Sequence, residues 1–271
     1  MAAADLSALA AWLPVRTPPD ILERVRTVQP LSPAERYNAQ PGDLNEGDGV
    51  DCPLCLNRGT VAVEAEDGTL TVRECSCMAK RRSIRLLRAS GLQDLVARCR
   101  FSNFEATDEW TTTAKRAAQS YVDSPPGAWM YISGPPGTGK THLATAATRR
   151  MIGAGLTTRY MLWREDAPRL KALVNDAEAY DAEIRKYTSV QCLYIDDFLK
   201  QSGAPSSADL NLAFSILNNR YNSRTKRTIL SSELPLREVQ RLDPAIAGRI
   251  RERSRGYILE APKTAVDRRN V

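Results

Sequence analysis

The chain lacks any apolar run that approaches the roughly 18 residues needed to span a bilayer. Its first residues, MAAADLSALAAWLPV, also lack the basic start that is typical of a secretory signal. The two absences predict a cytoplasmic protein with no membrane partner. Cysteine is scarce, with 6 residues in 271. In a cytoplasmic protein of this composition, cysteines indicate metal ligation or free thiols rather than disulfides.

A strong excess of one charge is also missing. The net charge of +6 and the pI near 9.1 permit contact with a polyanion but do not require it. The hydrophobic content of 42% and the charged content of 26% are ordinary for a globular protein. A length of 271 residues allows one large domain, or a domain with an appendage.

Residues 134–141 read GPPGTGKT and match the phosphate-binding pattern G-x-x-x-x-G-K-[ST]. The glycines permit turns in which successive amides point into one anion-sized hollow at a helix start. Lys140 can then reach the β and γ phosphates of ATP, and the Thr141 hydroxyl can hold Mg²⁺. The strand-like YIS before the motif and the helix-like HLATAATRRM after it supply the expected context. The predicted nucleotide-binding residues here are Gly134, Pro135, Pro136, Gly137, Thr138, Gly139, Lys140, Thr141 and His142.

A second nucleotide-binding element follows the apolar strand predicted at 191–195. Asp196 and Asp197 stand at its carboxyl end, where α/β folds place their chemistry. After a phosphate loop, this is the Walker B pattern, in which Asp196 orients Mg²⁺ and Asp197 polarises the attacking water. The alternative is a cluster of acids at a helix start. Further strands are predicted at 157–163, 228–231 and 257–260.

Two further segments are candidates for contact with the nucleotide. The strand at 228–231 ends in Ser-Ser-Glu, and Ser232, then Glu233, is the choice for touching the γ phosphate or its attacking water. Simple polarity of a strand end is the alternative. Phe101 and Phe104 precede the first strand of the core, where aromatic side chains flank an adenine base or belong to the core.

The helix predicted at 245–254 places Arg249 and Arg253 four residues apart on one face. In an isolated ATPase these are surface arginines. In a ring or filament, one of them would cross into the neighbouring subunit's site and neutralise charge that develops on the γ phosphate.

Two cysteine pairs flank a hairpin-like pair of stretches at 59–65 and 69–73. Thiol pairs at the two ends of a hairpin can converge on a tetrahedral ion, and so small a module has no other adequate source of stability. Structural zinc is therefore predicted, with unligated thiols and an iron–sulfur cluster as alternatives. Cys99 and Cys192 stand apart and are interpreted as buried apolar residues. The predicted zinc ligands are Cys52, Cys55, Cys75 and Cys77.

The rest of the amino-terminal part is less regular. Residues 1 to about 42 are predicted to be a helical arm, with short helices at 6–13 and 19–28. The following segment, 42–51, is rich in glycine and acids and is predicted to be a linker. Residues 79–100 carry seven basic residues and one acid, and form either a solvated helix face or a nucleic-acid contact. The predicted units are the arm and linker (1–50), a zinc-ribbon-like module (51–78), a basic linker helix (79–100) and an ATPase domain (101–271).

The motifs from residue 52 to residue 260 resemble those of AAA+ ATPases. CPLC with CSC, the basic helix, FSNF, GPPGTGKTHL, LYIDDF, ILSSELP and GRIRER together resemble the DnaC/DnaI-type replicative helicase loaders, especially their phage and prophage forms. The resemblance implies an α/β fold: a three-layer αβα P-loop core with a parallel sheet behind a small zinc-binding domain. It implies that Arg253 is the arginine finger, with Arg249 beside it. It also implies an ATP-controlled ring or spiral whose amino-terminal module holds a hexameric replicative helicase while the ATPase domains hold single-stranded DNA.

Two departures from the family pattern define the alternatives. Asp197 replaces the usual catalytic Glu, so hydrolysis is expected to be slow. No carboxyl-terminal helical lid is evident, so a sensor arginine would be Arg268 or Arg269, or absent. The runner-up functions are an IstB-type transposition helper, which binds duplex DNA and generally lacks the cysteine module, and an ATP-switched adaptor with little hydrolysis. For DNA contact, residues 164–175 and the basic helix are both candidates.

Overall fold

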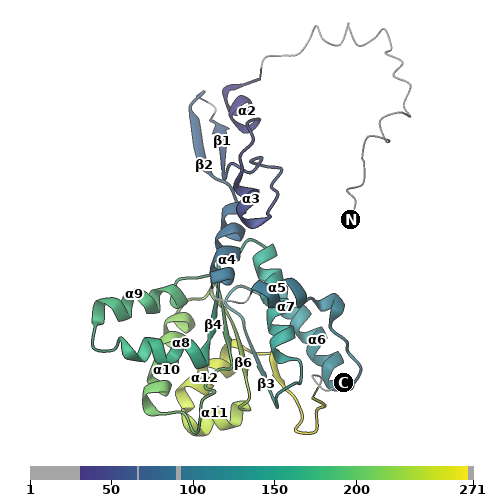
Figure 1. Ribbon diagram of the computed structural model, residues 1–271, viewed down its shortest axis with the longest axis vertical. Helices are drawn as coiled ribbons and strands as arrows, with labels where there is room; N and C mark the ends of the chain where they lie inside the picture. Colours follow the sequence, from purple (N-terminus) through teal and green to yellow (C-terminus); the bar gives the residue numbers. More distant parts are fainter. Residues whose placement is uncertain (1–30, 66, 90–92, 268–271) are drawn as a thin grey trace, which may run out of the picture.

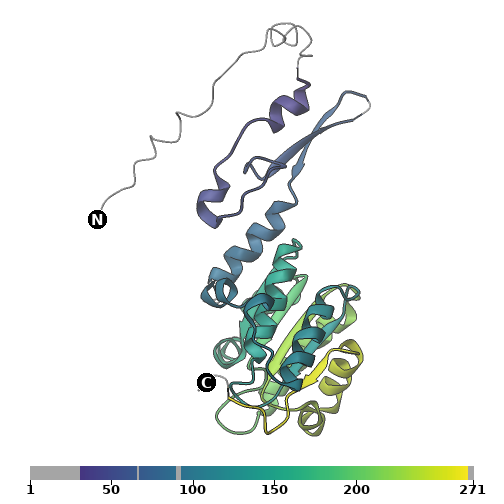
Figure 2. The same cartoon turned by 90° about the vertical axis from the view of Figure 1, so that its right-hand side faces the viewer.

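The computed structural model describes residues 31–65, 67–89 and 93–267 and shows a small amino-terminal module beside a larger α/β domain (Figure 1). Helix α4 runs between the two parts in both views (Figures 1 and 2). The helices predicted at 6–13 and 19–28 lie outside the described residues. The elements of the module and its connection are α2 (Pro33–Asn38), α3 (Leu44–Asp48), β1 (Thr60–Glu64), β2 (Leu70–Glu74), α4 (Cys77–Ala89) and α5 (Gln93–Arg98).

The module is built on an antiparallel hairpin of β1 and β2, as the sequence predicts. Helix α2 begins at Ser32 with a capping box that Glu35 closes. At the other end of α2, the Asn38 amide donates to the carbonyl of Ala62 at 2.9 Å and accepts from its N–H at 2.8 Å. These two bonds fasten α2 to the outer edge of β1.

Residues 42–51, predicted to be a linker, contain helix α3. Asp48 at the end of α3 is 8% exposed and pairs with Arg81 of α4 at 2.6 Å. The linker prediction was wrong here because composition alone cannot show a partner that lies 33 residues away. The acid that suggested a solvated linker is buried against an arginine.

One serine attaches α4 to the α/β domain. Ser83 is fully buried, and its hydroxyl donates to the carbonyl of Leu156 at 2.6 Å and accepts from the N–H of Thr158 at 2.9 Å. Thr158 begins the edge strand of the sheet. Ser83 therefore satisfies backbone groups at that edge. Residues 90–92 lie outside the described residues, and the next helix is α5.

The α/β domain contains a five-stranded parallel sheet in the order β4-β5-β6-β3-β7. Its register pairs Ser133 with Ser232 and Ile195 with Leu230, so β3, β5 and β6 end at the same edge. That edge carries both predicted nucleotide-binding motifs. The strands are β3 (Trp129–Ser133), β4 (Thr158–Leu162), β5 (Cys192–Asp196), β6 (Arg227–Ser232) and β7 (Ile258–Glu260).

Helices cover both faces of the sheet (Figure 1), and alternate strand residues divide the core in two. Met130 and Ile132 pack with α6 (Glu109–Val122) and α7 (Lys140–Gly153), whereas Tyr131 packs with the helices on the opposite face. The predicted three-layer αβα core with a parallel sheet is confirmed. The remaining elements are η3 (Phe101–Asn103), α8 (Trp163–Ala172), α9 (Ala177–Thr188), α10 (Ser207–Asn222), α11 (Leu236–Leu242) and α12 (Pro244–Arg253).

Within the described ranges, none of the helices combines the length and the apolarity that a membrane span requires. The described residues after β7, 261–267, form no helix.

We expect Ser83→Ala to lower the free energy of unfolding by about 2–3 kcal/mol, because it leaves the Leu156 carbonyl and the Thr158 N–H without their buried partner. Urea titration followed by circular dichroism measures the change. Ser120→Ala, at an exposed position in the last turn of α6, is the matched control and should change little. Equal stability of Ser83→Ala and the control would contradict the attachment.

Candidate functional site

The phosphate loop joins β3 to α7 at the carboxyl edge of the sheet. Gly139, the N-cap of α7, has a φ of 88°, and a side chain there would meet the Phe104 ring at 2.8 Å. Both the positive φ and the closeness of the Phe104 ring require glycine at this position. The first amides of α7 consequently stand open at the loop, where they favour an anion.

The side chain of Lys140 is folded onto its own loop. Its Nζ donates to the carbonyls of Gly134 at 2.8 Å and Pro135 at 2.7 Å. Burial lowers the pKa of Lys140, and the carboxylates of Glu233 and Asp197 oppose that effect. A phosphate is the stronger acceptor, so nucleotide binding offers this desolvated ammonium group a better partner than two carbonyls.

Asp196 gathers side chains from three parts of the fold. Its Oδ1 lies 3.4 Å from the Thr141 hydroxyl and accepts from Ser231, and its Oδ2 accepts from Tyr160 at 3.3 Å. Burial raises the pKa of Asp196, against the hydrogen bond from Ser231. A carboxylate and a hydroxyl from facing elements are oxygen ligands of the kind Mg²⁺ prefers. Thr141 and Asp196, the predicted Mg²⁺ residues, are therefore brought together and fit the ion.

The two serines at the end of β6 have different partners. Ser232 is buried, donates to the carbonyl of Phe198 at 2.8 Å and accepts from the N–H of Leu234. Ser231 is the serine that faces Asp196. The two serines differ because successive strand residues point to opposite faces. The hydroxyl of Ser232 is engaged with the backbone, and its contact with the γ phosphate stays a prediction. Glu233, the second choice, does lie among the charges around Lys140.

Arg249 and Arg253 do not join this cluster within one chain. Arg249 donates to the Asn218 side chain at 2.8 and 3.0 Å and lies 4.4 Å from the centre of the Phe214 ring. Arg253 donates to the Tyr221 carbonyl and lies 4.9 Å from the centre of that ring. Both side chains are held against α10. A role at an ATP site therefore requires a neighbouring copy of the chain and stays a prediction.

A cavity of about 380 Å³ adjoins the phosphate loop. Phe104 is 5% exposed there and meets the His142 ring edge-to-face at 5.1 Å. Phe104 thus belongs to a core cluster and also lines this cavity, and Phe101 packs against the same cluster. The cavity is lined by Asn103, Phe104, Glu105, Gly137, Gly139, Lys140, Thr141 and His142.

The segment after β7 also borders the loop, which sequence reasoning did not indicate. A side chain at Gly134 would collide with Ala261, and one at Gly137 would collide with the carboxylate of Asp267. Residues 261–267 therefore lie against one side of the phosphate loop. On the α6 side, the Trp110 indole donates to the Thr138 carbonyl at 3.3 Å. The tail candidates for a sensor arginine, Arg268 and Arg269, lie outside the described residues.

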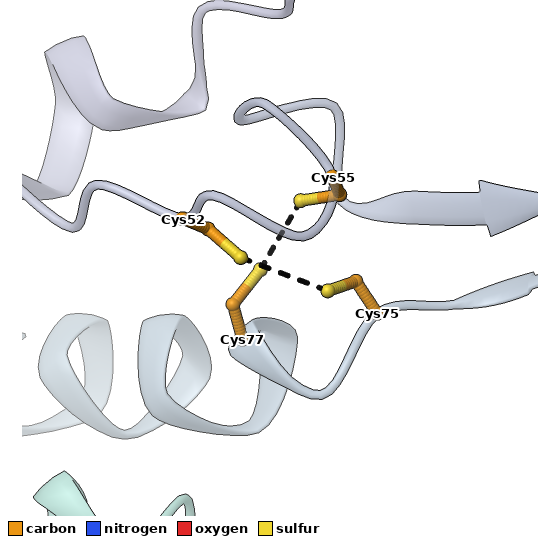
Figure 3. A group of neighbouring side chains, drawn as sticks. All are labelled: Cys52, Cys55, Cys75 and Cys77. Carbon is orange, nitrogen blue, oxygen red and sulfur yellow. Dashed lines mark hydrogen bonds between the residues drawn. The ribbon is translucent and has the colours of Figure 1, made fainter. Parts of the chain in front are cut away.

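The four predicted metal ligands converge at the start of α4 (Figure 3). The sulfurs of Cys52 and Cys75 are 3.8 Å apart and those of Cys55 and Cys77 are 3.6 Å apart, and all four lie within 4.8 Å of one another. Sulfurs at about 2.3 Å from a tetrahedral Zn²⁺ lie about 3.8 Å from each other. The separations are too long for disulfides. The four side chains therefore fit a closed, structural zinc site.

Arg81 supports this cysteine cluster from α4. It is fully buried and donates to Asp48 at 2.6 Å, to the Val50 carbonyl at 2.7 Å and to the Asn57 side chain at 2.9 Å. Burial acts to lower the pKa of Arg81, but Cys77 and Asp48 beside it leave that pKa raised. Four thiolates around Zn²⁺ leave two negative charges, so a buried guanidinium beside them offsets charge while it holds the cysteine loops.

Purified protein is expected to carry about one Zn²⁺ per chain, and Cys75→Ser to lose most of it, because a hydroxyl is a poor ligand for the ion. Elemental analysis gives the stoichiometry. Removal of zinc with a chelator should speed proteolysis within residues 51–78, since metal binding and folding are coupled in small modules. Cys99→Ala, outside the cluster, should keep its zinc. Absence of metal, or a visible absorption band from iron–sulfur chemistry, would contradict the assignment.

Comparisons with known proteins agree with this geometry. The family of IstB-like ATP binding proteins matches residues 60–253. The phage-like element PBSX protein XkdC of Bacillus subtilis (strain 168) is 30% identical over 226 residues, 77% of this chain and 81% of that protein. The replicative helicase loader DnaC of Escherichia coli (strain K12) is 24% identical over 178 residues, 64% of this chain and 71% of that protein.

A crystal structure of the DnaC helicase loader shares the fold, with a TM-score of 0.52 at 21% sequence identity, over 62% of this chain and 98% of the solved one. The resemblance seen in the sequence motifs is thereby confirmed. The chain belongs to the IstB-like ATP binding protein family and shares the AAA+ fold of the DnaC helicase loader.

Proposed function

We propose that the protein is an ATP-dependent loader of a replicative DNA helicase onto single-stranded DNA. The observation that carries the proposal is the attachment of a four-cysteine module to the edge of the AAA+ sheet, through Ser83 of α4. A loader needs one part that holds the helicase and another that responds to ATP, and the two must be joined firmly enough to influence each other. The similarity to a relative named as a helicase loader supports the same function.

In this proposal, Mg²⁺ and ATP occupy the site built on Lys140, Thr141 and Asp196. Asp197 orients the water that attacks the γ phosphate, and its short side chain makes turnover slow. Arg253, with Arg249 beside it, acts in the site of a neighbouring copy in a ring or spiral. Zn²⁺ keeps the module folded but takes no part in the reaction.

Single-stranded DNA is proposed to bind along α8 rather than along α4. The arginines of α4 already have internal partners: Arg81 pairs with Asp48, and Arg82 pairs with Glu74 at 2.8 Å. On α8, the side chain of Arg169 is 75% exposed, against 44% for Arg82, and its pair with Asp166 is long at 3.7 Å. Arg164, on the same helix, lines a small cavity. Exposed cations are the ones that can release counterions from a phosphate backbone.

An IstB-type transposition helper is the second candidate, because the family match carries that name. The cysteine cluster favours the loader. The third candidate, an adaptor that ATP switches without turnover, uses the same site without the role of Asp197.

Tagged, zinc-loaded protein mixed with a lysate of the source cells is expected to capture a hexameric replicative helicase, identified by mass spectrometry. Capture should be roughly tenfold stronger with ATP and Mg²⁺ than without, a typical size for coupling between two sites. Lys140→Ala should capture the same small amount in both conditions, because its ammonium is the loop's contact with the phosphates.

Lys186→Ala, on the surface of α9, is the control and should keep the ATP dependence. Capture of a transposase, together with preferential binding to duplex DNA, would support the helper instead. ATP-dependent capture with no hydrolysis above that of Asp197→Ala would select the adaptor.

A further inference from the structure

Lys200 lies in the ATP site although no motif indicated it. Its Nζ is 2.7 Å from Oε1 of Glu233 and 3.4 Å from Oδ2 of Asp197. The three side chains are each about one-third exposed and come from the turn after β5 and from the end of β6. One ammonium group thus bridges the Walker B acid pair to the acid at the next strand end.

The turn that carries Lys200 is held in an unusual conformation. Asp197 and Leu199 have φ values of 52° and 60°, which side chains rarely adopt and which persist only where the surroundings impose them. Phe198 and Leu199 are buried, and the Phe198 N–H donates to the Ser231 carbonyl at 2.8 Å. The Lys200 N–H donates to the Asp197 carbonyl at 2.9 Å, which closes the turn. The backbone therefore directs the lysine back toward Asp197.

The charges of this group act where the γ phosphate must lie. The carboxylates of Glu233, Asp197 and Asp196 and the ammonium group of Lys200 all influence Lys140, whose pKa burial lowers. Without Lys200, the carboxylates of Asp197 and Glu233 would repel each other and the incoming phosphate. The ion pair instead holds the two carboxylates close together.

We propose that Lys200 is a positioning residue for ATP hydrolysis, whose ammonium group bridges Asp197 and Glu233 and holds the Asp197 carboxylate where it orients the attacking water. The inference rests on the proposed ATPase function. The water oxygen bonds to the γ phosphorus, and the bond from that phosphorus to the β–γ bridging oxygen breaks. The water loses one proton to solvent by way of the Asp197 carboxylate, and ADP and inorganic phosphate leave. Lys200 neither gains nor loses a proton. Its contribution is geometric. The side chain of Asp197 is one methylene shorter than the usual Glu, so its carboxylate must be held in place to contact the water.

The test compares Lys200→Met, Lys200→Arg and Lys186→Met in the zinc-loaded full chain. Lys186 is the matched control, since it also pairs with an acid three residues earlier, Glu183, but on the surface of α9. Single-turnover hydrolysis of MgATP and calorimetric ATP affinity are measured for each. Lys200→Met should hydrolyse at least about tenfold more slowly, as a small misplacement does in other active sites, with ATP affinity within about threefold. Lys200→Arg should keep at least about a third of the rate, and Lys186→Met all of it.

A second measurement separates positioning from a general loss of structure. Glu233→Gln and the double variant with Lys200→Met complete a cycle, in which the double variant should be no slower than Lys200→Met alone. A rate for Lys200→Met within about twofold of wild type, or a loss of ATP affinity as large as the loss of rate, overturns the inference. So does failure of Lys200→Arg to exceed Lys200→Met.

The same proteins distinguish this inference from the loader proposal. Normal ATP hydrolysis without helicase capture contradicts the loader proposal, and the rates of the Lys200 variants then still decide the role of Lys200. ATP-dependent capture by a wild-type protein that never hydrolyses ATP leaves the partner intact and overturns the role of Lys200.

Discussion

The buried carboxylate of Asp196 is the constraint on which the nucleotide site depends. It is the common acceptor for hydroxyl groups from the phosphate loop, from β4 and from β6. Burial disfavours its charged form and raises its pKa, so the ionised carboxylate is destabilised without a cation. A Mg²⁺ ion bound with the nucleotide would offset that destabilisation. The same buried charge therefore fixes the shape of the site and creates its demand for metal.

The features that could be predicted from the sequence are those that depend on residues close together in the chain. The phosphate loop, the hairpin between the cysteine pairs and the strands of the sheet lie close to their predicted bounds, because each depends on local turns and apolar runs. The sequence is less informative where the answer depends on distant partners or on strand phase. Apolar runs do not show which of Ser231 and Ser232 faces Asp196, because a shift of one residue in register reverses the face. The burial of Asp48 depends on Arg81, and the place of Lys200 on a turn that no pattern describes.

The basic segment shows how composition can suggest one role and structure another. Its arginines make the chain look ready for nucleic acid, but several of them hold the module together. Arg81 ties α3 to the cysteine loops, Arg82 reaches Glu74 of β2, and Arg88 donates to the carbonyl of Gly47. These arginines help to stabilise a module that is too small for a large apolar core, because one buried guanidinium can donate to several acceptors at once. The excess charge of the whole chain is therefore a poor guide to where a polyanion binds.

The anchoring of α4 has a geometric consequence for any assembly. Cys77 starts this helix and Ser83 lies six residues later, about 9 Å along its axis, so the metal end and the sheet edge share one short rod. In a set of copies related by repeated rotation, each rod points the same way relative to its own sheet. The β1–β2 hairpins of all copies would then lie on one side of the layer of ATPase domains, and the distance between them would follow from how neighbouring domains pack at the nucleotide sites.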